Sequence, residues 1–195
     1  MSEIPANPSK TTLRATALAA RDALSGEHRA AAARQIALRG LPVAMPPGLV
    51  VAGYSPIRSE IDPTPLMQRL AAQGARLALP AIAGRDQPLE FRAWSAGDRL
   101  LRGLLGILEP SPQAAEIVPD IVLVPLAAFD RSGQRIGYGA GHYDRSLAQL
   151  RGRGKILAIG LGFAVQQIEA VPALPHDAAL DYVLTENQSF DCQSF

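Results

Sequence analysis

Short apolar segments of strand length alternate with segments of helical periodicity through most of this chain. The apolar segments span residues 49–54, 76–80, 120–125, 155–160 and 181–184, and helical patterns at 64–73 and 143–151 lie between some of them. Near-continuous apolar strands are typical of a mainly parallel sheet that helices cover on both faces. We therefore predict an α/β fold, a three-layer α/β/α arrangement with a mainly parallel sheet and Rossmann-like topology.

Two further expectations follow from this pattern. Apolar and polar residues alternate at 89–94, which indicates a solvent-edged hairpin. Ligands bind beyond the carboxyl ends of the strands in such sheets. Functional residues are therefore expected after Tyr54, Pro80, Pro125 and Gly160.

A helical segment precedes the alternating part. Ser9 is suited to cap a first helix, and an Ala-rich second helix over 27–39 is stopped by Gly40 and Pro42. We predict a single domain over residues 1–195, in which a helical segment at 9–40 packs on an α/β core at 48–186.

Composition excludes several classes of protein. A formal net charge of +1 argues against a nucleic-acid binder, and 48% hydrophobic residues indicate a real core. The single cysteine, Cys192, excludes an internal disulfide and a cysteine-based zinc site. The chain has no apolar run near the roughly 20 residues of a membrane span, and its polar start lacks the apolar part of a signal peptide. We expect a cytoplasmic, monomeric enzyme that acts on small molecules, without nucleic-acid or membrane partners.

Three cations share one face of the first predicted helix. Lys10, Arg14 and Arg21 fall within an arc of roughly 40° at about 100° per residue, and no acidic residue lies one turn away from them. This arrangement suits an anion. A solvated helix face explains the spacing as well, and both interpretations stay open.

The strongest motif is a glycine-rich loop between the strand at 120–125 and the helix at 143–151. It runs Arg135-Ile136-Gly137-Tyr138-Gly139-Ala140-Gly141-His142-Tyr143-Asp144-Arg145. Glycines at alternate positions expose backbone N–H groups, and the start of the following helix adds partial positive charge. We interpret the loop as a phosphate cradle, with Asp144 placed to bind Mg²⁺ through oxygen. The alternative is a glycine-rich turn required only for packing.

A polar loop follows the first predicted strand. Tyr54, Ser55 and Glu60 offer an aromatic face, a hydroxyl and a carboxylate that can accept hydrogen bonds from a heterocycle. A polar turn before the helix at 64–73 is the alternative. His176-Asp177 is a weaker signal, since such a pair is more often a loop cap.

Together these motifs resemble the 5-formyltetrahydrofolate cyclo-ligase family almost from end to end. The resemblance includes Lys10-x-x-Leu13-Arg14 with Arg21, Tyr54…Glu60, Leu79-Pro80, Leu89-x-Phe91-Arg92-x-Trp94, Gly106-Ile107-Leu108-Glu109-Pro110, the segment from Val124 to Arg145, and the ending His176-Asp177…Asp181-x-Val183-x-Thr185-Glu186. The chain departs from the family at Ala140, where glycine or lysine is usual, and at His142, where an aromatic residue is usual. Alanine penalises a positive φ, so a stiffer or differently turned loop is expected.

The resemblance implies a ligase that forms a C–N bond. 5-Formyltetrahydrofolate and ATP would give 5,10-methenyltetrahydrofolate, ADP and phosphate, with Mg²⁺ as cofactor. It implies Arg135, Tyr143 and Arg145 as catalytic residues. The implied ATP-binding residues are Lys10, Arg14, Arg135, Ile136, Gly137, Tyr138, Gly139, Ala140, Gly141, His142 and Tyr143. The implied folate-binding residues are Tyr54, Ser55, Glu60, Trp94, Tyr138 and His142.

The expected metal ligands are Asp144 and, from the resemblance, Asp177. Asp120, Asp130 and Asp181 are the alternatives, of which Asp120 and Asp181 are poorer because they begin strands, at the opposite edge of a parallel sheet.

Two rival functions remain at this point. A sugar-phosphate isomerase or a CoA-transferase-like enzyme would use a similar α/β sheet, but the glycine loop and the unpaired helix cations favour a nucleotide. A module that binds RNA or protein would need a basic surface or an aromatic strand, and the aromatic content is 5%.

Overall fold

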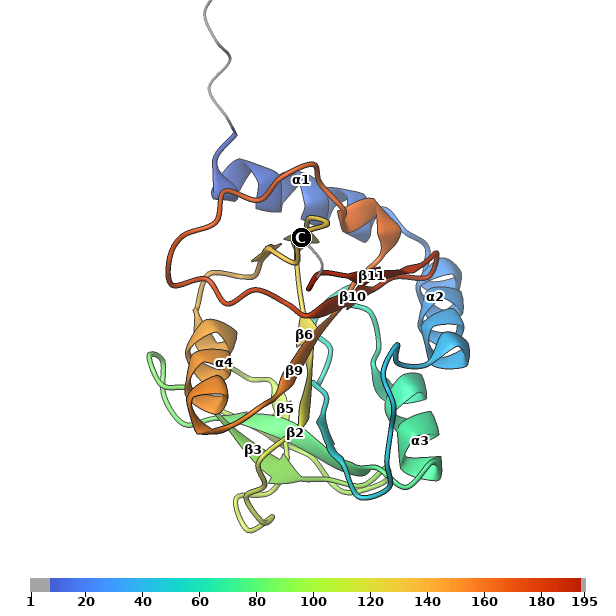
Figure 1. The fold of residues 1–195 in the computed structure, drawn as a ribbon, viewed down its shortest axis with the longest axis vertical. Helices are drawn as coiled ribbons and strands as arrows, with labels where there is room; N and C mark the ends of the chain where they lie inside the picture. The colour runs from blue at the N-terminus through green and yellow to red at the C-terminus, as the bar shows by residue number, and fades with distance from the viewer. Residues whose placement is uncertain (1–7, 194–195) are drawn as a thin grey trace, which may run out of the picture.

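The computed structural model describes residues 8–193, and a seven-stranded sheet runs through the centre of the molecule (Figure 1). The order across the sheet is β11-β10-β9-β6-β1-β2-β3. Its strands are β1 (Val50–Ala52), β2 (Arg76–Ile82), β3 (Leu89–Ala93), β6 (Ile121–Pro125), β9 (Leu157–Leu161), β10 (Tyr182–Leu184) and β11 (Ser189–Asp191). The five predicted apolar segments form the five parallel strands of this sheet.

The strands β1 and β6 are parallel, and the direction in which successive strands are added to the sheet reverses between them. β2 pairs with one side of β1, the chain then returns to place β6 on the other side, and β9 and β10 continue outward in parallel. Val51 is therefore in register with Leu77 on one neighbour and Ile121 on the other. At such a switch point the connections leave in opposite directions and open a crevice at the carboxyl edge of the sheet. Antiparallel strands β3 and β11 close the two edges.

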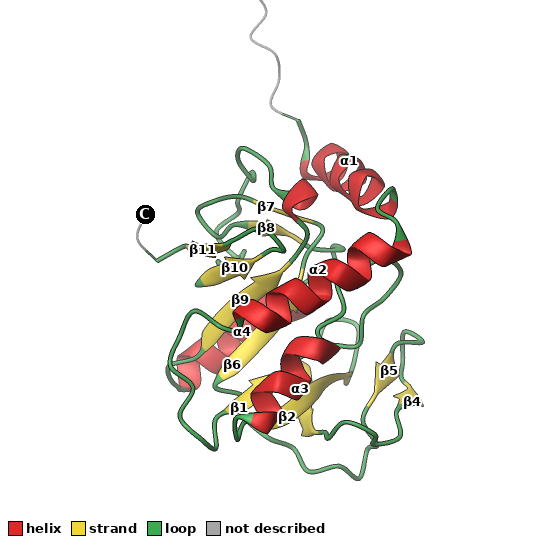
Figure 2. Ribbon diagram, turned by 90° about the vertical axis from the view of Figure 1, so that its right-hand side faces the viewer, coloured by secondary structure: helices red, strands yellow, loops and turns green. Residues whose placement is uncertain are grey.

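Helices cover both faces of the sheet, as predicted (Figure 2). α2 (Gly26–Arg39) and α3 (Thr64–Ala72) pack on the face that presents Val51, and α4 (His142–Arg153) packs on the face that presents Val50. The two valines are wholly or almost wholly buried. Successive strand residues therefore enter opposite cores, which explains why these strands are apolar throughout.

Helix α1 (Lys10–Asp22) lies across the carboxyl end of the sheet (Figure 1). Ser9 caps it by accepting a hydrogen bond from the amide of Thr12, which confirms the predicted start. Ala17 packs with Ala128 and Ile136. These two residues belong to a small ribbon formed by β7 (Ala128–Phe129) and β8 (Arg135–Ile136), which leads into the glycine loop.

Several short elements were not predicted. They are β4 (Leu101–Arg102), β5 (Leu108–Glu109), β7, β8, β11 and the 3₁₀ turn η1 (Ala164–Gln166). Each strand among them is two or three residues long, too short to show a period. The segment at 89–94 does form an edge hairpin, because β3 pairs antiparallel with β2.

Three expectations stand apart from this description. No helix among residues 8–193 is long and apolar enough to cross a membrane. The expectation of no signal peptide concerns a segment that begins at residues 1–7, which lie outside the described residues. The single-domain organisation stays a prediction.

Gly133 allows a stability test of the ribbon that carries the glycine loop. Its φ is +81°, and a Cβ there would lie 2.4 Å from the carbonyl oxygen of Leu180. Left-handed backbone costs a non-glycine residue about 1–2 kcal/mol, and the backbone contact adds to this cost. We expect Gly133→Ala to lower the free energy of unfolding in urea by at least about 2 kcal/mol.

The matched control is Gly152→Ala in helix α4. Nothing lies within 4 Å of the Cβ that this change would add. Alanine favours a helix interior over glycine by about 0.5–1 kcal/mol, so the control is expected to be slightly more stable than the parent. Equal stabilities for the two variants would contradict the prediction.

Candidate functional site

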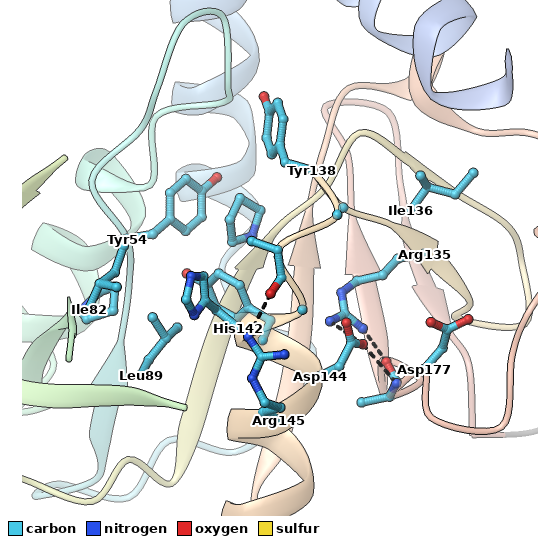
Figure 3. A pocket seen from close by; sticks show the side chains of 18 of the residues that line it. Tyr54, Ile82, Leu89, Arg135, Ile136, Tyr138, His142, Asp144, Arg145 and Asp177 are labelled. Carbon is cyan, nitrogen blue, oxygen red and sulfur yellow. Dashed lines mark hydrogen bonds and ion pairs between the residues drawn. The ribbon is translucent and has the colours of Figure 1, made fainter. Parts of the chain in front are cut away.

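A cavity of about 970 Å³ opens at the carboxyl edge of the sheet, beside the switch point (Figure 3). Its walls come from α1, the loop after β1, the ends of β2 and β6, the β4–β5 hairpin, the glycine loop with the start of α4, and the loop at 174–178. Tyr54, Pro80 and Pro125 lie in its wall, as the sheet pattern predicts.

One side of the cavity is cationic. Lys10 and Arg14 project from α1, and the Nε of Arg14 donates a 2.6 Å hydrogen bond to the carbonyl oxygen of Gly137. Lys10 forms an ion pair with Asp177. The cationic stripe of the first helix therefore faces the glycine loop rather than bulk solvent.

The glycine loop turns sharply into α4. Gly139 and Gly141 have φ values of +96° and +69°, and Gly141 caps the helix without a side-chain hydrogen bond. The first N–H groups of α4 therefore lack a capping side chain, which leaves them available to an anion.

Arg58 is the only non-glycine residue in the described chain with a positive φ, so Ala140 carries no such strain. The positive φ assumed for Ala140 is therefore absent, while a stiffer or differently turned loop stays a prediction.

Arg135 is buried beneath this loop. It donates one hydrogen bond to the carbonyl oxygen of Ala178 and another, of 2.9 Å, to Oδ1 of Asp144. The amide of Ala178 also donates to Oδ1 of Asp144. This group ties the start of α4 to the loop at 174–178.

Asp177 takes a similar position in that loop. Its Oδ2 accepts hydrogen bonds from Lys10 and from the amide of Leu174. Partial burial raises the pKa of Asp177, but these hydrogen bonds and the charge of Lys10 outweigh it and hold the pKa below its usual range. Asp144 and Asp177 thus each keep one carboxylate oxygen outside these bonds.

Three further predicted residues lie between the two sides of the cavity. Arg145 turns back to donate a 2.7 Å hydrogen bond to the carbonyl of Ala140. Burial raises the pKa of Tyr143 far above its ordinary value, so its phenol stays neutral. His142 is buried, and its Nδ1 lies 3.0 Å from the carbonyl oxygen of Gln87, which makes Nδ1 the donor.

The opposite side of the cavity is largely apolar. Tyr54, Ile82 and Leu89 face it, across from Arg135 and Asp177 (Figure 3). The hydroxyl of Tyr54 donates to the carbonyl of Ile61, so its ring is fixed. Ser55 lies in the same wall and donates to the carbonyl of Leu108.

Glu60 adds a buried carboxylate to this side. Its Oε2 accepts a 2.8 Å hydrogen bond from the amide of Ile57. Burial raises the pKa of Glu60 to about 7, although the Ile57 amide and the nearby Arg21 charge act in the opposite direction. The carboxyl can therefore change charge near neutral pH.

Comparison with known proteins agrees with this site. The sequence model of the 5-formyltetrahydrofolate cyclo-ligase family matches residues 6–186. The 5-formyltetrahydrofolate cyclo-ligase of Mycolicibacterium smegmatis is 36% identical over 156 residues, which cover 76% of this chain and 77% of the relative. That of Escherichia coli is 31% identical and covers 88% of this chain and 97% of the relative.

A solved structure agrees as well. The 5,10-methenyltetrahydrofolate synthetase of Aquifex aeolicus superposes with a TM-score of 0.76 at 30% identity, over 95% of this chain and 94% of that one. The chain belongs to the 5-formyltetrahydrofolate cyclo-ligase family. The predicted family and α/β fold class are thereby confirmed.

Two sequence expectations about this cyclo-ligase family member do not agree with the structure. Trp94 does not line the cavity, because antiparallel β3 carries it back to the amino edge of the sheet, where its amide bonds the carbonyl of Leu77. No residue described after Gly160 lines the cavity until Leu174. Gln166 does not line the cavity. Its side-chain amide donates hydrogen bonds to the carbonyls of Leu126 and Ala127, in the loop that follows β6.

The alternative metal ligands have structural partners. Asp120 accepts from the amide of Val50 and Asp181 from that of Ala158, both at the amino edge of the sheet. Asp130 is buried and accepts from the amides of Ser132, Gln134 and Val171. Within residues 8–193, no group of three or more acidic, histidine or cysteine residues is arranged to hold a metal ion by itself.

Sequence reasoning missed part of the apolar side. Ile82, Leu89, Leu105, Ile107 and Glu109 all line the cavity and were not predicted as site residues. Ile107 and Glu109 belong to a motif that carried the family resemblance. Their place in the cavity wall depends on how the β4–β5 hairpin folds back, which spacing in the sequence does not show.

The raised pKa of Glu60 gives a test in the free protein. The carboxyl of Glu60 has a pKa of about 7 in the folded protein and an ordinary pKa of 4.5. Between these two pH values it is protonated in the folded chain and ionised in the unfolded chain. Stability from this group is therefore complete below the unfolded pKa and is lost as the pH rises toward the folded pKa. We expect the parent to lose about 3 kcal/mol of unfolding free energy, relative to Glu60→Gln, between about pH 4 and about pH 8.

Urea unfolding of both proteins across this pH range measures the difference. The glutamine variant keeps the volume and can still accept from the Ile57 amide, so it removes only the titration. A difference between the two proteins that does not change with pH would contradict a raised pKa.

Proposed function

We propose that this chain converts 5-formyltetrahydrofolate and ATP into 5,10-methenyltetrahydrofolate, ADP and phosphate. The observation that carries the proposal is one cavity with two chemically distinct sides, a cationic glycine loop facing an apolar wall that bears a carboxylate. A phosphate chain suits the first side, and a heterocycle with N–H donors suits the second. Membership of the cyclo-ligase family supports the same reaction. It does not favour the sugar-phosphate isomerase or the CoA-transferase-like enzyme.

The chemistry explains why both sides are needed. The oxygen of a formamide is a poor leaving group, so ring closure by the neighbouring nitrogen stalls. Transfer of the γ-phosphoryl group of ATP to that oxygen produces ADP and a phosphorylated imidate. The nitrogen at position 10 then attacks the formyl carbon, loses its proton, and phosphate departs. Such catalysis consists mostly of positioning and charge neutralisation.

The cationic side is proposed to hold ATP. The glycine loop presents backbone N–H groups, and Lys10 and Arg14 add positive charge from α1. Arg135 and Arg145 are mainly occupied with protein carbonyls and with Asp144, so we assign them to holding the loop and its charge in place. Tyr143, kept neutral by burial, is a hydrogen-bond donor toward the reacting oxygens.

The apolar side is proposed to hold the pterin. The Tyr54 ring packs against it, and Ser55 and Glu60 contact its polar edge. Tyr138 extends from the glycine loop at the mouth of the cavity (Figure 3). His142 uses Nδ1 to donate to Gln87, which leaves Nε2 for a hydrogen bond with the substrate.

Mg²⁺ is proposed as the cofactor, held by Asp144 and Asp177. The ion takes only one or two protein carboxylates and completes its shell with phosphates and water. Both aspartates line the cavity beside the glycine loop, and each has a carboxylate oxygen outside its own hydrogen bonds. When bound, the ion would neutralise charge on the phosphates. The cytoplasmic location and monomeric state stay predictions.

A spectroscopic assay tests the proposal. Purified protein mixed with 5-formyltetrahydrofolate, ATP and Mg²⁺ is expected to develop the near-ultraviolet absorbance of the methenyl product, with ADP formed in equal amount. Omitting ATP should abolish the signal, and omitting Mg²⁺ should strongly reduce it. Absence of product in the complete mixture would overturn the proposed function.

Arg14 tests the nucleotide side. A charge-assisted hydrogen bond contributes about 1.5–3 kcal/mol, so Arg14→Ala is expected to raise the KM for ATP at least about tenfold. The KM for 5-formyltetrahydrofolate should change much less. Arg34→Ala, an exposed position on α2, is the control and should leave both constants unchanged. Unaltered ATP kinetics in Arg14→Ala would remove α1 from the nucleotide site.

A further inference from the structure

Glu109 is a buried residue in the cavity wall, and its carboxylate has no role in the reaction proposed above. It ends β5 and is 8% exposed. Its carboxyl group rests directly on Gly103 of the same hairpin, where a Cβ would lie 2.0–2.2 Å from all three carboxyl atoms. Glycine at position 103 thus makes room for this carboxyl group.

The hydrogen bonds of Glu109 are incomplete. Oε1 accepts a 3.2 Å hydrogen bond from the amide of Ile82, while Oε2 has no partner within residues 8–193. No cation in this part of the chain lies within ion-pair distance of it. Asp144 and Asp177, on the opposite side, are each paired with a cation.

Oε2 of Glu109 is not among the fully buried atoms without a partner, so it keeps contact with solvent at the cavity wall and is open to a donor from a ligand. Burial raises the pKa of Glu109, as it does for Glu60. Leu105 and Ile107, from the same hairpin, line the cavity with apolar side chains. A ligand that fits here needs an apolar body and N–H donors at its rim.

A reduced pterin has this chemistry, and it carries N–H groups on both of its fused rings. Glu60 offers an acceptor from the loop after β1, and Glu109 offers a second from the β4–β5 hairpin. We infer that Glu109 is a specificity residue that accepts a hydrogen bond from a ring N–H of the reduced pterin. This inference rests on the proposed function, because it assigns the pterin to this side of the cavity.

Glu109→Gln tests the inference. Glutamine can still accept from the Ile82 amide through its carbonyl, so the hairpin keeps its attachment, but the charge is lost. A hydrogen bond to a charged acceptor corresponds to roughly a 10- to 100-fold change in binding. We expect the KM and the calorimetric Kd for 5-formyltetrahydrofolate to rise by this factor, with an unchanged KM for ATP and a melting temperature near that of the parent.

A pterin fragment locates the contact. 5-Formyl-6-methyltetrahydropterin lacks the aminobenzoyl-glutamate tail, and its binding should weaken by the same factor in Glu109→Gln. Glu169→Gln, an exposed position outside the cavity, is the control and should bind like the parent. Unchanged folate binding, a loss confined to the whole substrate, or an equal loss for ATP would each overturn the inference. Failure of the parent itself to bind 5-formyltetrahydrofolate would instead overturn the proposed function.

Discussion

The side chain of Arg21 joins the two sides of the cavity. It projects from α1, is almost fully buried, and donates hydrogen bonds to Oγ of Ser59 and to the hydroxyl of Tyr138. Ser59 belongs to the loop after β1, and Tyr138 belongs to the glycine loop. The guanidinium also lies 5.8 Å from the centre of the Tyr138 ring. One buried charge therefore fixes both loops relative to the helix that carries Lys10 and Arg14.

Burying a guanidinium is expensive, and Nη1 of Arg21 has no partner among the described residues. The hydrogen bonds to Ser59 and Tyr138 offset part of this cost, as does the carboxylate of Asp22, whose Oδ1 lies 3.8 Å from Nε of Arg21. An apolar residue at position 21 would relieve the cost but free the two loops to move apart. The buried charge of Arg21 is thus better explained by its role in positioning the two loops than by a contribution to the stability of the fold.

The charged groups are distributed unevenly across the cavity. On the cationic side, Lys10 and Arg135 form ion pairs with Asp177 and Asp144, which hold these side chains in place. Phosphates and a metal ion arriving together would meet both signs of charge already positioned, with little reorganisation. On the apolar side, neither Glu60 nor Glu109 forms an ion pair within residues 8–193, so their oxygens can accept hydrogen bonds from the N–H groups of a ligand.

Much of this arrangement is predictable from sequence, because it depends on local signals. The apolar segments predict the parallel strands, and the glycines before α4 predict an open helix N-terminus, which Gly141 provides. Trp94 and Glu109 were misplaced or missed for one shared reason. Both depend on antiparallel hairpins that fold back by an amount that neither periodicity nor spacing encodes.

The backbone and the side chains of the glycine loop face different parts of the cavity. Its N–H groups and the start of α4 lie on the cationic side of the cavity, while the ring of Tyr138 contacts Arg21 and Arg58. Arg58 has a left-handed backbone with a φ of 53°, and its guanidinium lies 5.9 Å from the centre of that ring. A displacement of the loop would therefore disturb both sites at once. Phosphoryl transfer to a formyl oxygen requires donor and acceptor atoms in contact, so a single loop bordering both proposed binding sites would supply the proximity that the reaction needs.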